Sequence, residues 1–248
     1  MPIFIKRESE IEKMRKAGKV AREAMECIKQ VIKPGVTGLD INNAAHEFIL
    51  LHGGVPSFLN YRGFPKSICI SVNDEILHGI PNKRVIKDGD IVSIDLGVFI
   101  DGYHSDMART FAVGNVSIEA EKLIEVTEQS FFEAMMYAKA GCHLHEISAV
   151  LEDVAVRNGY TVLQDFMGHG IGRNLHESPD IPCYKPKSKG AKLIEGMTLA
   201  IEPMVCAGNN EVCIAMDGWT VTTKDGGLTA HYENTVLITN GEPEFLTL

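Results

Sequence analysis

Two ten-residue stretches, IKDGDIVSID at 86–95 and LIEGMTLAIE at 193–202, resemble one another, and each ends an apolar run in a carboxylate. The tripeptides KPG (33–35) and KAG (139–141) precede them at nearly the same separation. Segments that recur in the same order favour an internal duplication over chance likeness. A duplicated chain predicts pseudo-two-fold symmetry, which would bring the two strand-end carboxylates to one central cleft.

Helices are predicted in front of each repeated stretch. Ser9 and Glu12 form a capping-box pattern, which predicts a helix that ends at KPG. Thr37 and Asp40 predict a second helix, ending at the glycines 53 and 54. In the other half, the residues from 117 to 138 form a long amphipathic stretch.

Strands are predicted next to these helices. SICISV (67–72) is followed by a hairpin of 90–100 and 103–113, joined by Asp-Gly at 101–102, a good tight-turn dipeptide. WTVTT and ENTVLIT (219–223 and 233–239) predict a second strand pair. The expected fold is α+β, with antiparallel sheets covered by helices. We expect a single domain over 1–248, built of two halves at about 1–115 and 116–248.

Composition narrows the classes of function. The 248 residues are 45% hydrophobic and 23% charged, with a net charge of -9, which disfavours nucleic acid and anionic membranes as partners. The six cysteines form no C-x-x-C pair, and no segment has the length of a membrane span or the pattern of a signal peptide. We therefore expect a cytoplasmic enzyme.

Four acids stand in strand-like, apolar surroundings without Lys or Arg nearby to match them: Asp95, Asp106, Glu202 and Glu233. A hairpin can place the first two on one face, because side chains alternate along a strand. One buried acid alone indicates a salt bridge, but four need cations or several donors. With His169, in the glycine-rich segment FMGHGIG, they suggest a metal site.

The motifs resemble those of the type I methionine aminopeptidases over nearly the whole chain. The resemblance rests on GHGIGRNLHESP (168–179), the Asp95-x10-Asp106 pair, IEPM (201–204), HYENT (231–235), NYRGFPKSICISVND (60–74) and LHGIP (77–81). It implies the pita-bread fold, with internal pseudo-symmetry, and removal of the initiator methionine from newly made proteins.

The resemblance also implies two divalent metal ions, of Co, Mn, Fe(II) or Zn. Asp106 and Glu233 would bridge the two ions, Asp95 would hold one, and His169 and Glu202 the other. The charges agree with this, because four carboxylates balance two divalent cations. Such a pair of ions lowers the pKa of a shared water and polarises a carbonyl.

Further site residues follow from the same resemblance. Glu202 would move a proton from water to the leaving amine, and His78 and His176 would bind the substrate and stabilise the developing oxyanion. From residue type alone, His78 would be a turn residue at a strand end. The methionine pocket would comprise Phe58, Tyr61, Phe64, Cys69, Leu175 and Trp219, residues that could equally be ordinary core.

The chain departs from the family pattern at a few positions. Leu175 and Phe58 replace an aromatic residue and a cysteine, and TAHYENT has His231 and Asn234 in place of glutamine and histidine. These changes affect the shape of the pocket and the surroundings of the site rather than the five ligands. The expected partners are N-terminal methionines of nascent polypeptides, with transient contact to the ribosome, and the expected state is a monomer.

Other functions remain open from the residues. A Xaa-Pro aminopeptidase or dipeptidase shares the fold but usually carries a further N-terminal domain. A non-catalytic pita-bread binding protein would have lost ligands, and a mononuclear hydrolase would use only part of the set.

Overall fold

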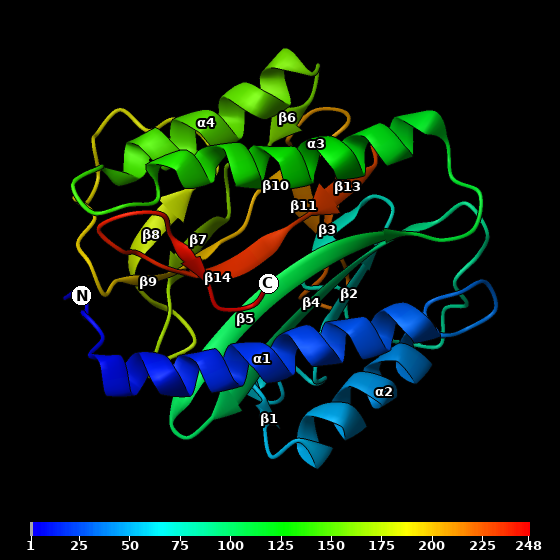
Figure 1. Ribbon diagram of the computed structural model, residues 1–248. Coiled ribbons are helices and arrows are strands. Elements are labelled where there is room, and N and C mark those ends of the chain that lie inside the picture. The colour runs from blue at the N-terminus through cyan, green and yellow to red at the C-terminus, as the bar shows by residue number, and fades with distance from the viewer. Residues whose placement is uncertain (1) are drawn as a thin grey trace.

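The computed structural model describes residues 2–248 and contains two helix pairs beside a central sheet (Figure 1). The first pair is α1 (Glu8–Val31) and α2 (Gly38–Leu51), and the second is α3 (Ile118–Ala134) and α4 (Leu144–Arg157). Two 3₁₀ turns, η1 (Tyr61–Gly63) and η2 (Met135–Tyr137), complete the helical elements of the described chain. No described helix is both long and apolar enough to cross a membrane.

Local capping sets the start of both α1 and α2, but in α1 the capping residues are not the predicted ones. Thr37 and Asp40 bond reciprocally, because Asp40 N donates to Thr37 Oγ1 at 3.2 Å and Thr37 N donates to Asp40 Oδ2 at 2.8 Å. The predicted Ser9 and Glu12 box is wrong, since both residues lie inside α1. Arg7 N instead donates to Glu10 Oε2 at 2.9 Å. The other oxygen of Glu10 accepts hydrogen bonds from the Tyr103 hydroxyl and the Arg173 guanidinium, so the capping residue is also held by long-range contacts.

The central sheet joins strands of both halves in the order β1-β4-β5-β14-β9-β7-β8, and each pair along it is antiparallel. β2 also pairs with β4, and β15 with β14. The bounds are β1 (Val55–Pro56), β2 (Cys69–Val72), β4 (Ile91–Ile100), β5 (Tyr103–Ala112), β7 (Met167–Gly170), β8 (Glu177–Pro182), β9 (Thr198–Ile201), β14 (Glu233–Leu237) and β15 (Glu244–Phe245).

The repeated stretches occupy comparable places in this sheet. The first repeated stretch contributes to β4 and the second to β9. β5 and β14 lie between these two strands and pair with one another. In Figure 1, β5 and β14 cross the centre of the view, with α1 and α2 below and α3 and α4 above. The expected α+β fold with antiparallel sheets and helices is confirmed.

Two three-stranded sheets lie beside the central one. They have the orders β13-β10-β6 and β11-β12-β3, with β3 (Glu75–Leu77), β6 (Thr161–Val162), β10 (Met204–Cys206), β11 (Val212–Ile214), β12 (Val221–Thr223) and β13 (Thr229–His231). The predicted pairing of 219–223 with 233–239 is wrong, because β12 pairs with β11 and β3. β14 instead pairs with β9, with β15 and with β5, which lies more than a hundred residues earlier.

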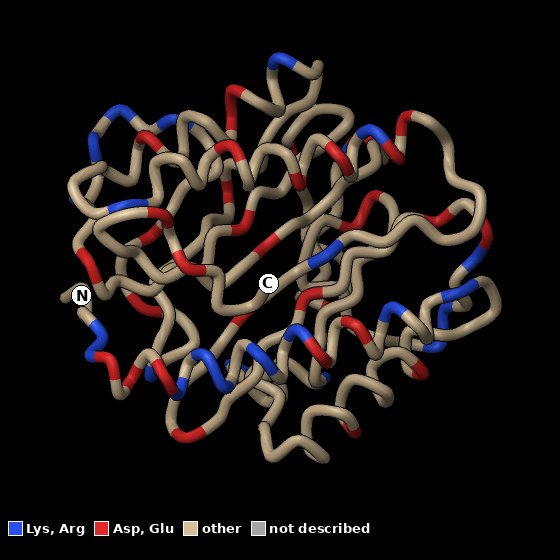
Figure 2. The backbone as a smooth tube through the Cα atoms, viewed as in Figure 1, with Lys and Arg blue, Asp and Glu red and all other residues tan. Residues whose placement is uncertain are grey.

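The helices cover one face of the sheet and leave the other for the site. Met107 on β5 belongs to the same apolar cluster as Ala17 and Ala21 of α1. Its strand neighbour Asp106 therefore points to the opposite face. Lys and Arg are spread over the helices and outer connections and are interspersed with Asp and Glu (Figure 2).

Candidate metal centre and active site

The hairpin of β4 and β5 places two aspartates diagonally on one face. Asp95 lies opposite Ala108, and Gly97 lies opposite Asp106, so the two acids are two positions out of register. The tight turn of the hairpin has positive φ at Asp101 (51°) and Gly102 (88°), as expected for an Asp-Gly dipeptide. Asp106 N donates to Thr235 Oγ1 at 2.9 Å, which connects this strand to β14.

His169 lies on β7, between two glycines that the packing of the strands requires. A Cβ at Gly168 would lie 2.5 Å from the carbonyl oxygen of Ala200, and one at Gly170 would lie 2.2 Å from that of Ser178. The glycines therefore allow close approach of backbone. His169 Nδ1 lies 2.9 Å from the carbonyl oxygen of Gly170. When Nδ1 donates there, Nε2 carries the free lone pair.

Glu202 follows β9, and Glu233 begins β14, so the second half supplies three of the five expected ligands. His169 Nε2 lies 4.0 Å from Asp106 Oδ2 and 3.8 Å from Glu202 Oε1. Ligand-type atoms of Asp106, His169 and Glu233 all lie within 4.8 Å of one another.

The burial of these acids makes them unusual in electrostatic terms. Burial raises the pKa of Asp95 and of Glu202 to about 7. It raises the pKa of Asp106 and of Glu233 well above the ordinary range, and the neighbouring carboxylates raise both further. Without cations the cluster therefore holds protons near neutral pH.

The residues fit a divalent cation. Among the described residues, buried oxygens without a hydrogen-bond partner include Asp95 Oδ1, Asp106 Oδ1 and Glu233 Oε1. Buried polar atoms are normally paired, and carboxylate oxygens with one imidazole nitrogen form the donor set that first-row divalent metals take. The unpaired oxygens and the donor set thus agree.

A cavity of about 320 Å³ opens beside this cluster. Four of the five expected ligands line it, whereas Asp95 does not. The same cavity is lined by all six residues expected for the methionine pocket, which are Phe58, Tyr61, Phe64, Cys69, Leu175 and Trp219. The Phe64 and Trp219 rings meet edge to face, with their centroids 5.2 Å apart. An apolar chamber therefore ends at a group of acids.

The two histidines expected to contact substrate both line this cavity. His78 has a positive φ of 58° directly after β3, a rare conformation for a non-glycine residue. Burial lowers its pKa to about 4. His176 stacks on Tyr61, and its Nδ1 lies 2.9 Å from the Tyr61 hydroxyl. Part of its side chain is open to solvent, yet desolvation of the ring lowers its pKa to about 3.

A buried ion pair supports the segment that carries His176. Lys6 Nζ lies 2.6 Å from Glu177 Oε2, and both side chains are about 95% buried. The other carboxylate oxygen of Glu177 accepts a hydrogen bond from Asn174 N at 3.1 Å. The chain before α1 thereby fixes the backbone on both sides of Leu175 and His176.

The structure also adds residues that the sequence did not indicate. The cavity is also lined by residues in loops and short segments that left no periodic signal, namely Arg62, Leu77, Asp165, Phe166 and Met167.

The two residues of TAHYENT that depart from the family pattern, His231 and Asn234, differ in location. Asn234 Oδ1 accepts from Arg109 Nη2 at 2.8 Å and from Thr247 Oγ1 at 3.0 Å, whereas His231 Nε2 lies 3.5 Å from Glu202 Oε2.

Known proteins are similar to this chain in sequence and in structure. Residues 12–240 match metallopeptidase family M24. A methionine aminopeptidase from Clostridium perfringens is 51% identical over 246 residues, with 99% of each chain covered. The structure of a methionine aminopeptidase from Thermotoga maritima has a TM-score of 0.97 at 42% identity, again over 99% of each chain.

A prolidase is similar to this chain in fold but less similar in sequence and coverage. The prolidase from Pyrococcus furiosus has a TM-score of 0.80 at 25% identity, covering 98% of this chain but 65% of that one. The fold is thus the pita-bread fold that these enzymes share, and identity and coverage are greater for the methionine aminopeptidases. The chain belongs to metallopeptidase family M24 and, within it, to the methionine aminopeptidases.

Proposed function

We propose that this protein removes the N-terminal methionine from nascent proteins and peptides whose second residue is small. The observation that carries the proposal is the cavity in which an apolar chamber ends at Asp106, His169, Glu202 and Glu233. A methionine side chain fits a chamber of rings and one sulfur, because its thioether is unbranched and polarizable. The acids then lie where the peptide bond after that residue would be.

Family membership implies divalent metal, and the proposed ligands are Asp95, Asp106, His169, Glu202 and Glu233. We propose that they hold two ions, since four carboxylates balance four positive charges. Bound metal of this kind supplies a water that is deprotonated at neutral pH and a Lewis acid for the carbonyl. The donor set suits Co, Mn, Fe(II) or Zn.

The other roles belong to side chains around the scissile bond. Glu202 accepts a proton from the attacking water and delivers it to the leaving amine nitrogen. His176, whose Nδ1 is engaged by Tyr61, offers Nε2 to the substrate. His78 faces the same cavity from the end of β3. Together the two imidazoles orient the peptide and stabilise the oxyanion.

The same proposal covers the setting of the enzyme. The two halves act as one domain, because one sheet runs through both. The six cysteines are free thiols, which supports work in the reducing cytoplasm. We also propose that the enzyme is a monomer and that it meets nascent chains near the ribosome.

The test is hydrolysis of a Met-Ala peptide beside an Ala-Pro peptide after addition of each metal. We expect turnover of the first only, and loss of turnover in Asp106→Asn. Preference for Ala-Pro would instead indicate a Xaa-Pro peptidase. Full activity with one bound metal equivalent would support the mononuclear alternative and contradict the two-ion site.

A further inference from the structure

His231 is buried next to the metal centre with a ring nitrogen that nothing satisfies. The residue is 2% exposed, and its Nε2 has no hydrogen-bond partner among the described residues. Leaving a buried nitrogen unpaired costs stability. In a native protein such an atom calls for an explanation, and an unfilled ligand position is one.

The backbone of His231 is held from both sides. His231 N donates to Thr110 Oγ1 at 2.9 Å, and the Thr110 hydroxyl donates to the His231 carbonyl, also at 2.9 Å. On its other side, β13 pairs His231 with Met204 of β10. Both neighbouring strands thus hold the backbone of this residue, and its Nε2 lies 3.5 Å from Glu202 Oε2.

Glu202 lies between two imidazoles, one on each of its oxygens. Oε1 is 3.8 Å from His169 Nε2, and Oε2 is 3.5 Å from His231 Nε2. Ligand-type atoms of Glu202, His231 and Glu233 lie within 4.8 Å of one another. With metal–ligand bonds of roughly 2.0–2.2 Å, two donors on one ion are separated by about 3 to 4.4 Å. Both contacts have the spacing of ligands that share an ion.

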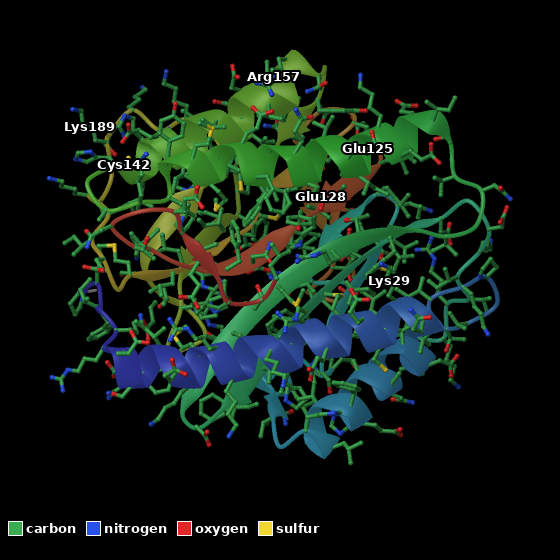
Figure 3. All side chains as sticks on the ribbon, in the orientation of Figure 1. Lys29, Glu125, Glu128, Cys142, Arg157 and Lys189 are labelled. Carbon is green, nitrogen blue, oxygen red and sulfur yellow. The ribbon has the colours of Figure 1, made fainter. Side chains whose placement is uncertain are left out.

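His231 also separates the metal centre from a second cavity. This cavity, of about 310 Å³, lies between α1 and α3 on the helix-covered side of the sheet. Its lining includes His231 together with Lys29 and Glu128, which are labelled in Figure 3. His231 thus approaches the carboxylates from the helix-covered side of the sheet, and it does not line the substrate cavity described above.

We propose that His231 Nε2 is a sixth protein ligand of the metal centre, on the ion also held by Glu202 and Glu233. This inference rests on the proposed metal site. Because His169 is assigned to the same ion as Glu202, His231 would be the second imidazole on that ion. A second imidazole shifts the preference of its ion toward Co, Ni and Zn over Mn.

A hydrogen bond from His231 to Glu202 is the competing role, and chemistry separates the two. A separation of 3.5 Å is long for a hydrogen bond. His231→Gln keeps an amide donor near Glu202 but removes the imidazole nitrogen, whereas His231→Ala removes both. A ligand role predicts that the two variants behave alike.

The experiment is Co(II) titration of metal-free protein, followed by calorimetry and by the visible spectrum of the bound ion. We expect both His231 variants to weaken one of two binding events about 10-fold or more and to change the spectrum. His145→Gln, a substitution on α4 outside the site, should match the wild type. Wild-type affinity and spectrum in His231→Gln would overturn the proposal.

Two further measurements keep the outcome unambiguous. In Co(II)-loaded wild type, proton NMR should show two paramagnetically shifted imidazole N–H signals, and a single signal would contradict ligation by His231 even if the variants fail to fold. Asp106→Asn tests the centre itself. If it retains both metal equivalents, the proposed site is wrong, whereas loss of metal in Asp106→Asn with none in His231→Gln rejects only the sixth ligand.

Discussion

Replacing Asp95 with asparagine should stabilise the metal-free protein at alkaline pH. Burial raises the pKa of Asp95 from the ordinary 3.8 to about 7. Between these values the folded state binds a proton that the unfolded state does not, so this group lowers the free energy of unfolding as the pH rises. Its stabilising share is complete below the unfolded pKa and is lost as the pH rises through the folded pKa.

The size of the effect follows from the two pKa values. Between pH 5 and pH 8 the ionisation of Asp95 costs the folded state about 2.5 kcal/mol more. The neutral amide of the Asp95→Asn variant carries no such cost. The Tm of Asp95→Asn relative to wild type should therefore rise by roughly 5–10 °C over this range, for a chain of this size.

The assay is thermal unfolding of metal-free wild type and Asp95→Asn at pH 5, 6, 7 and 8. Buried histidines with lowered pKa, such as His78 and His104, oppose the trend in each protein, but they are present in both and cancel in the difference. Glu47→Gln, on the exposed side of α2, is the matched control and should show no such slope. With excess metal the sign should reverse, because wild type binds the ions more tightly.

One result would refute the reasoning. If the Tm difference between Asp95→Asn and wild type is the same at pH 5 and pH 8, then Asp95 is ionised across the range. The cluster would in that case be satisfied without metal, and the argument from unpaired carboxylates would fail.

Three other predictions concern the site. His176→Ala should keep both metal equivalents but lose about 10²-fold in kcat, because one donor to the developing charge is worth roughly 3 kcal/mol. If metal titration shows the loss of one equivalent, His176 is a metal ligand instead. Leu175→Phe should change the ratio of kcat/KM between Met- and Leu-initiated peptides, within the roughly 1–3 kcal/mol that an apolar pocket can discriminate, and an unchanged ratio would place Leu175 outside the pocket. Lys6→Ala should lower the free energy of unfolding by about 3–5 kcal/mol, because it leaves Glu177 buried and unpaired. In the same denaturant titrations the double variant Lys6→Met with Glu177→Leu should lose far less, and equal losses would mean that packing, not charge, explains the effect.

Sequence alone was sufficient where the determining contacts are local. The Thr37 and Asp40 cap and the Asp101-Gly102 turn depend on residues a few positions apart, and both are present. The repeated stretches could be recognised because an apolar run that leads to an acid is distinctive in any context. The acid lies in the middle of β4 and directly after β9. The acids were conspicuous because an ionised group in an apolar strand needs a partner.

Prediction failed where distant residues decide. The start of α1 is capped by Glu10 rather than by Ser9 and Glu12, and Glu10 also meets Tyr103 and Arg173, which no local pattern encodes. One of the two partners of β12 is β3, about 145 residues earlier, and hydrophobic alternation does not specify which strands pair. His231 was recognised as a departure, but its distance from Glu202 depends on the pairing of β10 with β13.

The central position of β14 has a consequence for how the chain is made. Among the strands of the sheet only β15 follows it in sequence, yet it lies between β5 and β9. Until residues 233–237 have left the ribosome, both of those strands present open edges, which are sites for aggregation and wrong pairing. Contacts between residues this far apart in sequence also form slowly. Synthesis therefore passes through a stage at which the nascent enzyme itself needs protection by chaperones, and a chain truncated before Glu233 remains in that state.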